Sequence, residues 1–486
     1  MKTKLILLVA AGLVASCRNY LDEIPTAQIT TVNFYRTDRD ITEAVNSVYG
    51  QLTANWQERM HMLSELRADH IQAGPQASNA GRIVPFDLLT YDNLNGDILN
   101  TWSTFYTAIN NANTVVERVP GATQAAEATR KRVLAEARFL RAFSYYNLVR
   151  LWGRVPLILT ATAPNGNLQV SRNTEDEIYA AIITDLQYAA GETPDNPGLP
   201  LIYGGANNGR ATIGAANALL AEVYLTRRNW AKAAEYAQKV VASNRYALWP
   251  NYTDVFLYVN KYAANSAPNG EAIFEFQYQQ DAAVPTFIIR WTGPRDVLFQ
   301  GLVTGRGGFG SYASPPLFFN SFSPPDARRA SIFPETYPNQ NGVATRLNTD
   351  PRNVYNMKYK LDGQNAPFGN AGNNWPILRL ADVLLIQAEA LNEASGPTAD
   401  AYAAINRIRN RARLPNLTTG LSQAAFRDSL YAERSKELFL EGDRWFDLLR
   451  TNRLTSELAR VGVTVTDAQR FLPIPQSELD LNPNLR

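Results

Sequence analysis

Three glutamates near the C-terminus have the chemical type and the spacing of a hydrolytic site. Glu433, Glu437 and Glu441 stand four residues apart, which places their carboxyl groups on one face of a helix. Two carboxyl groups in an open cleft can act as the acid and the base of a glycoside hydrolase. Arginines such as Arg434 and Arg444 are close in the sequence, and the same helix carries leucines for packing. We therefore favour an ion-pair network that pins two helices together.

Other residue types that commonly act in catalysis or metal binding are scarce. The two histidines, His61 and His70, lack the i, i+4 spacing that places two imidazoles on one metal. The single cysteine, Cys17, excludes an intrachain disulfide framework and any cysteine-rich zinc or iron–sulfur site. Arg138 and Arg141 could hold an anionic ligand, but buried pairing with carboxylates is the favoured interpretation. We predict no metal and no cofactor.

The position of the cysteine predicts a lipid anchor. A short basic start precedes an apolar run, Leu5 to Ala15, which is too short to span a membrane and suits a secretory signal. Small residues stand directly before Cys17, as in a bacterial lipobox. We predict that residues 1–16 are a signal peptide and that acyl chains on Cys17 anchor residues 17–486 to a membrane.

Charge and composition exclude some classes of function. The 486 residues include 47 lysines and arginines against 45 acidic residues, a balance that gives no attraction to nucleic acid. A hydrophobic fraction of 45% is enough for a sizeable core, which excludes a chain that is disordered throughout.

Helical periodicity covers most of the chain and predicts a mainly α fold. Single helices are predicted at residues 38–52, 102–119 and 123–152. Asp38 or Asp40 could cap the first of them. Hairpins of two helices, the first with tetratricopeptide-like spacing, are predicted at residues 213–243, 378–412 and 426–453. In the last hairpin, Gly442 can take the left-handed conformation that ends one helix, and Asp443 can cap the next.

One long region lacks this periodicity. Residues 268–376 hold 12 of the 27 prolines and 17 aromatic residues, and the alternation at 272–278 predicts a short strand. A long irregular insertion in a helical protein is usually functional. We expect one domain, with a helical scaffold at about 38–260 and 377–486 and an irregular, aromatic-rich lobe with a few short strands at about 265–376.

A series of sequence blocks runs in order from the lipobox to the C-terminus. They include WSTFYTAINNAN at 102–113, AEARFLRA at 135–142, EGDRWFDL at 441–448 and FLPIP at 471–475. Further blocks lie at 17–25, 151–156, 378–390, 406–412 and 433–438. Together they resemble the SusD/RagB family of nutrient-binding lipoproteins, nearly from end to end.

This resemblance implies a helical protein with four tetratricopeptide-like units, anchored on the outer membrane and facing the exterior. It implies capture of a glycan and its delivery to a SusC-like TonB-dependent β-barrel, without enzymatic activity. In glycan-binding relatives, aromatic rings of the lobe meet a polar loop before the helix that here begins near Trp102. We predict stacking rings at Trp291, Tyr312 and Tyr91, with hydrogen-bond partners at Asn93, Asn95 and Arg306.

Alternatives to glycan capture remain open at this stage. The same scaffold could capture peptides or another nutrient, since only the cleft distinguishes the two ligands. Two further alternatives are a hydrolase with paired carboxylates and a scaffold that binds only proteins. The aromatic-rich lobe favours a glycan, because exposed flat rings stack on a sugar at a low cost in side-chain entropy.

Overall fold

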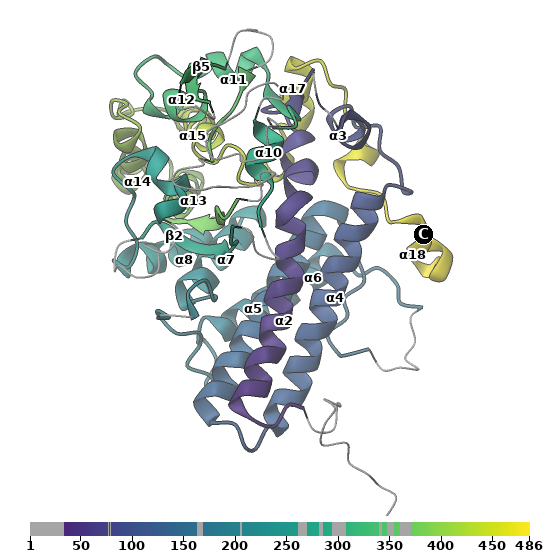
Figure 1. The fold of residues 1–486 in the computed structure, drawn as a ribbon. Coiled ribbons are helices and arrows are strands. Elements are labelled where there is room, and N and C mark those ends of the chain that lie inside the picture. Colours follow the sequence, from purple (N-terminus) through teal and green to yellow (C-terminus); the bar gives the residue numbers. More distant parts are fainter. Residues whose placement is uncertain are drawn as a thin grey trace, which may run out of the picture.

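The computed structural model describes most of the chain after residue 33. The described residues are 34–75, 77, 79–162, 169–204, 207–260, 270–280, 285–293, 308–339, 343–347, 354–359 and 371–486. Cys17 and Arg306, both singled out above, lie outside them. The fold is mainly helical, as predicted, with short strands set among the helices (Figure 1).

Long helices form the lower part of the molecule in Figure 1. They are α2 (Asp38–Glu58), α4 (Gly96–Arg118), α5 (Glu127–Trp152) and α6 (Glu175–Ala189). Helix α5 contacts the other three and is buried along most of its length. This agrees with the broad apolar surface of residues 123–152, which only a helix packed on several sides can bury. Helix α6 has no counterpart among the predicted elements.

The first helix begins with a different cap from the one predicted. The hydroxyl of Thr37 accepts a hydrogen bond from the Asp40 N–H at 3.3 Å, and the Asp40 carboxylate accepts one from the Thr37 N–H at 2.9 Å. This reciprocal pair is a capping box, so Thr37 is the cap and Asp40 its partner. Asp38 instead accepts from the N–H of Ala126 at 2.9 Å, at the start of α5.

Two of the predicted hairpins are confirmed closely. They consist of α7 (Ile213–Thr226) with α8 (Trp230–Ala242), and of α13 (Leu380–Ser395) with α14 (Ala399–Arg411). Helix α13 lies against α7, α8, α14 and α15 (Gln423–Glu437), and so joins the hairpins. The start of the second hairpin differs from the prediction, because residues 378 and 379 belong to a strand.

The third predicted hairpin is less regular. Helix α15 ends at Glu437, four residues early, and α16 (Arg444–Arg450) follows a turn in which Leu440 and Gly442 have φ of 59° and 107°. Gly442 is thus left-handed as predicted, but Asp443 makes no capping hydrogen bond with its side chain. The chain continues through α17 (Leu454–Arg460), the 3₁₀ turn η7 (Asp467–Arg470), α18 (Gln476–Leu481) and η8 (Pro483–Leu485).

Two helical elements near the start of the chain were also not predicted. The π-helical turn η1 (Met62–Leu66) is buried, and α3 (Ala80–Asp87) lies inside residues 74–100, whose glycines, prolines and asparagines predict a loop. The prediction of a loop there was wrong because Gly81 and Pro85 usually interrupt helices, yet α3 is short enough to contain both. Further 3₁₀ turns are η2 (Val119–Gly121), η4 (Tyr252–Phe256) and η5 (Tyr258–Asn260).

The lobe contains short strands and short helices. The predicted strand is confirmed as β2 (Ala272–Phe276), which pairs antiparallel with β7 (Trp375–Arg379). A small antiparallel sheet has the order β1 (Gln72–Ala73), β3 (Tyr312–Ser314) and β6 (Val354–Tyr355), and a hairpin joins β4 (Thr336–Pro338) to β5 (Ala344–Arg346). The helices are α10 (Ile288–Thr292), α11 (Pro316–Asn320) and α12 (Ala327–Ile332).

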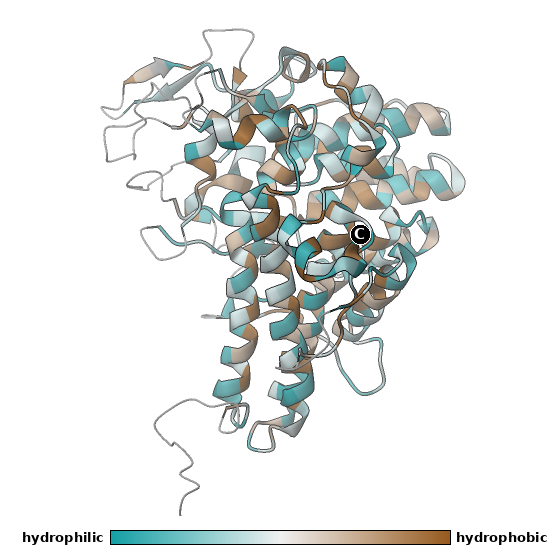
Figure 2. Ribbon diagram, turned by 90° about the vertical axis from the view of Figure 1, so that its right-hand side faces the viewer, coloured by the Kyte–Doolittle hydropathy of each residue, from teal (hydrophilic) through white to brown (hydrophobic). Residues whose placement is uncertain are grey.

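A continuous apolar core runs through scaffold and lobe. Figure 2 shows hydrophobic and hydrophilic residues alternating along the long helices, as expected for helices buried on one side. Trp102, Trp152, Trp375 and Trp445 are buried, and Trp230 is half-buried. Within the described residues, no helix has the length and apolar character needed to cross a membrane.

Candidate ligand-binding site

The polar loop before α4 is held in place by its own amide side chains. The Asn95 side chain accepts hydrogen bonds from the N–H groups of Asp97 at 2.9 Å and Ile98 at 3.2 Å, and so caps α4. The Asn93 side chain donates to Gln476 Oε1 at 2.7 Å, and the Asn93 carbonyl accepts from the Gln476 N–H at 2.8 Å. Both predicted hydrogen-bond partners thus have structural roles that shape the loop.

Tyr91 is the one predicted ring that reaches the surface in the described part of the lobe and loop. Its ring is half-buried, stacks on Phe86 of α3 at 5.3 Å between centroids, and lies 5.2 Å from the guanidinium of Arg67. Leu88 and Leu94 on the same loop are 55% and 74% exposed. The loop therefore presents two exposed leucines beside a partly exposed aromatic ring.

Trp291 and Tyr312 lie in the core instead. The two rings are 2% and 0% exposed and stack on each other, with centroids 5.6 Å apart. His61 packs against both, and its Nδ1 is hydrogen-bonded to the Tyr312 hydroxyl. The expectation that these rings offer open faces was wrong, because α10 and the pairing of β3 with β1 turn them inward, where burying large rings is most favourable.

Helix α3 connects the loop to this buried ring pair. Arg82 lies 5.2 Å from the Trp291 ring and binds Asp97 in the first turn of α4 with hydrogen bonds of 2.9 and 2.7 Å. Four residues later on the same helix, Phe86 supports Tyr91. Residues separated by about two hundred positions in the sequence therefore meet at α3. No pattern in the sequence indicated Arg82, because it lies in a stretch whose composition predicts a loop.

A further ring near this surface is Phe309. It is half-buried, 6.0 Å from Trp291 in an edge-on arrangement, and covered by the guanidinium of Arg290 at 4.0 Å. The only feature of the sequence that indicates Phe309 as a candidate site residue is its place in the aromatic-rich lobe. We call the surface formed by Arg82, Leu88, Tyr91 and Leu94 the ring-and-loop surface.

Both histidines are buried. Burial lowers the pKa of His61 to about 3, with a contribution from Arg82, and burial likewise lowers that of His70 to about 3. Both imidazoles are therefore neutral over the physiological range, and His70 stacks on Phe318 at 3.9 Å. Among the described residues, no cluster of three histidine, cysteine or acidic side chains could hold a metal ion.

The three glutamates form a buried ion-pair network, as predicted. Glu437 pairs with Arg379 at 2.6 Å and with Arg328 at 3.1 Å, and Glu441 pairs with Arg379 at 2.7 Å. Glu433 pairs with Arg328 at 2.6 Å. The partners differ from the neighbouring arginines considered above, since Arg328 and Arg379 come from α12 and from the end of β7.

The electrostatics of this network are unsuited to acid–base chemistry. Burial alone would raise the pKa of Glu437, but Arg411, Arg379 and Arg328 hold it well below its usual range. A glycosidase acid needs the opposite shift, and an open cleft beside it. Glu433, Glu437 and Glu441 are all at most 7% exposed.

The paired arginines of α5 differ from each other. Arg141 binds Asp185 of α6 through two hydrogen bonds of 2.7 and 2.8 Å, which confirms its predicted carboxylate pairing. Arg138 instead lies 4.0 Å from the ring of Tyr188. Both side chains therefore join α5 to α6.

Comparison with known families matches both halves of the chain. A family model described as "Starch-binding associating with outer membrane" matches residues 19–225, and the SusD family model matches residues 333–462.

Individual proteins are similar over nearly the whole chain. A SusD-like protein of Formosa agariphila is 30% identical and covers 100% of this chain and 98% of its own. The starch-binding protein SusD of Bacteroides thetaiotaomicron is 25% identical over 77% of this chain and 75% of its own.

Solved structures have the same fold. A SusD superfamily protein of Parabacteroides distasonis matches with a TM-score of 0.79 and 25% identity, covering 94% of this chain and 99% of its own. A laminarin-binding SusD-like protein matches with a TM-score of 0.76 and 24% identity, covering 92% and 98%.

Proposed function

This chain belongs to the SusD family, and on that premise we propose that it captures a glycan outside the outer membrane and delivers it to a SusC-like TonB-dependent barrel. The similarity to the starch-binding SusD over 77% of the chain carries the glycan part of the proposal. The laminarin-binding protein with the same fold supports it. Association with the outer membrane follows the description of the model that matches residues 19–225.

The ring-and-loop surface is the place where we expect the glycan to bind. The partly exposed ring of Tyr91 would stack on the apolar face of a pyranose, and Arg82 and the loop amides would border its hydroxyls. Binding by a few exposed contacts is weak to moderate, since small ligands gain limited free energy per atom. Repeated contacts along a polymer would add avidity.

Binding without cleavage is the mode of action that we propose. The glutamates considered as a hydrolytic pair are buried and paired with arginines, which hold the pKa of Glu437 below its usual range, and this supports a binding protein over a hydrolase. Capture of a peptide by the same scaffold is the remaining alternative. Release of reducing sugar from any polysaccharide by pure protein would contradict the binding-only mode.

The first test is a binding screen. Residues 18–486 would be run by affinity electrophoresis against plant, microbial and host glycans, with a peptide pool beside them. We expect retardation by one class of glycan. Tyr91→Ala should weaken that binding about fivefold, the loss of roughly 1 kcal/mol of ring stacking. Tyr188→Ala, a half-buried ring of α6, is the control. Capture of peptide with no glycan retarded would move the protein to the peptide alternative.

The proposed anchor and partner have their own test. Cys17→Ala in the full-length protein should move the chain from the membrane fraction to the soluble fraction, because the acyl chains would be missing. Purification of the wild-type chain from its native membrane should bring the barrel with it. An unchanged membrane fraction for the variant would contradict anchoring at Cys17.

A further inference from the structure

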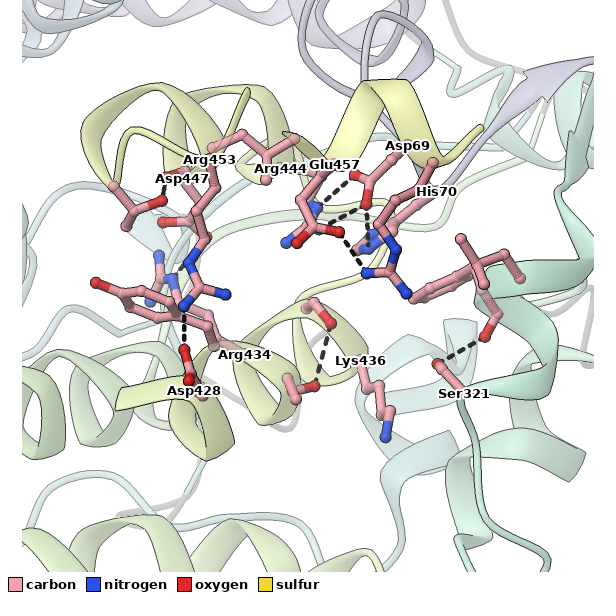
Figure 3. A pocket seen from close by; sticks show the side chains of 18 residues that line it. Asp69, His70, Ser321, Asp428, Arg434, Lys436, Arg444, Asp447, Arg453 and Glu457 are labelled. Atoms are coloured by element: carbon pink, nitrogen blue, oxygen red, sulfur yellow. Dashed lines mark hydrogen bonds and ion pairs between the residues drawn. The ribbon is translucent and has the colours of Figure 1, made fainter. Parts of the chain in front are cut away.

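A charged cavity lies apart from the ring-and-loop surface, between α11, α15, α16 and α17. Its volume is about 370 Å³, within the range of small-ligand sites (Figure 3). One wall is a face of α15 whose residues recur every three or four positions: Asp428, Tyr431, Ala432, Ser435 and Lys436. The other walls include Asp69 and His70, the first turn of α16, and Glu457 and Arg460 of α17.

Most of the charges that line this cavity neutralise one another. Arg444 holds Asp69 through two hydrogen bonds of 2.7 Å, and Arg460 pairs with Glu457 at 2.6 Å. The remaining pairs are Arg434 with Asp447 and Arg453 with Asp428. All four lining carboxylates are engaged in this way, so the cavity has no free anion with which to attract a cation.

Lys436 is the exception among the five cations that line the cavity. It has no carboxylate within 4.0 Å in the described part of the chain, and no dashed line reaches its amine in Figure 3. The ring of Phe322 lies beside it, with its centroid 5.7 Å from Nζ. Glu433, one turn earlier on α15, is occupied by Arg328 and Arg409.

The surroundings of Lys436 leave its charge uncompensated. Burial lowers its pKa, and the charges that act on it include the carboxylates of Glu433 and Asp326 and the guanidiniums of Arg328 and Arg409. These groups act in opposite directions, because the two carboxylates raise the pKa and the two guanidiniums lower it. The side chain of Lys436 is half-buried, and an anion bound in the cavity would supply the ion-pair partner that the described carboxylates do not provide.

The cavity also has an apolar side. Leu317, 43% exposed, and Phe318, stacked on the neutral His70, supply the apolar groups.

We propose that this cavity binds an anionic group, a carboxylate or a sulfate, of the captured saccharide, with the ammonium of Lys436 as its counter-ion. This inference rests on the proposed glycan function and narrows it to acidic glycans. The apolar side formed by Leu317 and Phe318 would face the ring carbons of the same sugar unit.

The test compares acidic and neutral forms of one glycan by calorimetry. Oligogalacturonate supplies carboxylates, its methyl ester is the neutral match, and a carrageenan oligosaccharide supplies sulfates. We expect the wild-type chain to bind one acidic probe about tenfold more tightly than the neutral one, the strength of a charge-assisted hydrogen bond. Lys436→Met should abolish this preference, and Lys436→Arg should retain most of it.

The matched control is Lys232→Met, which removes the same charge from an exposed position on α8 paired with Glu235. It should leave the preference for acidic glycan unchanged. Equal binding of neutral and acidic probes, or an unaltered preference in Lys436→Met, would overturn the cavity assignment while the proposed glycan function stands. Failure to bind any glycan would remove both. If inorganic sulfate competes with the carrageenan probe but not with oligogalacturonate, the site is assigned to sulfate.

Discussion

At the scale of single residues, the structure separates rings that support the fold from rings that can meet a ligand. Trp291 is 2% exposed and packed between Tyr312 and His61. Trp291→Ala should therefore lower the free energy of unfolding by about 3–5 kcal/mol, as for other buried aromatic truncations. Urea denaturation followed by circular dichroism would measure this. A variant with normal stability and lost glycan binding would instead place Trp291 in the binding site.

Glu65 provides a pH-dependent prediction at the same scale. Burial raises the pKa of this carboxyl from 4.5 to about 7, although Oε1 accepts N–H groups from Gly442 at 2.7 Å and Asp443 at 3.1 Å. Because the folded pKa exceeds the unfolded one, folding takes up a proton between these pH values. The contribution of Glu65 to stability is thus complete below pH 4.5 and is lost as the pH rises through about 7.

Glu65→Gln should remove this dependence, since the amide stays uncharged at every pH. We expect the variant to gain roughly 3 kcal/mol relative to the wild type between pH 4.5 and pH 7, from the size of the shift. Urea midpoints measured across this range would show it. Glu43→Gln, at an exposed position, is the control. Parallel pH profiles for wild type and Glu65→Gln would contradict the raised pKa.

At the scale of elements, Asn95 determines where the candidate loop ends and α4 begins. Asn95→Ala removes the acceptor for the Asp97 and Ile98 N–H groups and should cost about 1 kcal/mol of stability. Asn95→Asp keeps an acceptor and should keep the stability. Thermal unfolding of both variants measures the capping role of Asn95, and glycan retardation measures its effect on binding. Full stability in Asn95→Ala would show that the cap is dispensable.

Local patterns explain which elements were predictable. The hairpin of α7 and α8 could be bounded closely, because its turn interrupts two clear apolar stripes. Helix α3 was missed because Gly81 and Pro85 are breakers whose effect tertiary contacts overcame. Helix α15 ends at Glu437 and not at Glu441, because the chain turns at Leu440 and Gly442, whose positive φ values a right-handed helix does not contain.

At the scale of the whole molecule, the burial of the Trp291 and Tyr312 rings could not be predicted from the sequence. Whether Tyr312 is open or covered depends on its pairing with Ala73, about 240 residues earlier in the chain. No local pattern reports such a pairing, because strands β1 and β3 have only two and three residues. The unpaired Lys436 has the same origin, since its neighbours come from several distant elements that only the fold brings together.

Ion pairs of Arg379 join the lobe to the scaffold, and we therefore predict that the two parts unfold together. This residue ends β7 and pairs with Glu271, Glu437 and Glu441 at 2.6–2.7 Å, while 1% exposed. Arg379→Met would leave buried carboxylates without this partner and should cost about 3–5 kcal/mol.

The control for this prediction is Arg427→Met, which removes a more exposed ion pair with Glu393 and should cost at most about 1 kcal/mol. Urea unfolding followed by tryptophan fluorescence and by circular dichroism should give coincident transitions in the wild type, because one core spans both parts. Because the uncompensated carboxylates of Arg379→Met regain neutrality on protonation, its deficit should shrink as the pH falls. A deficit no larger than that of Arg427→Met would show that the network does not join the two parts.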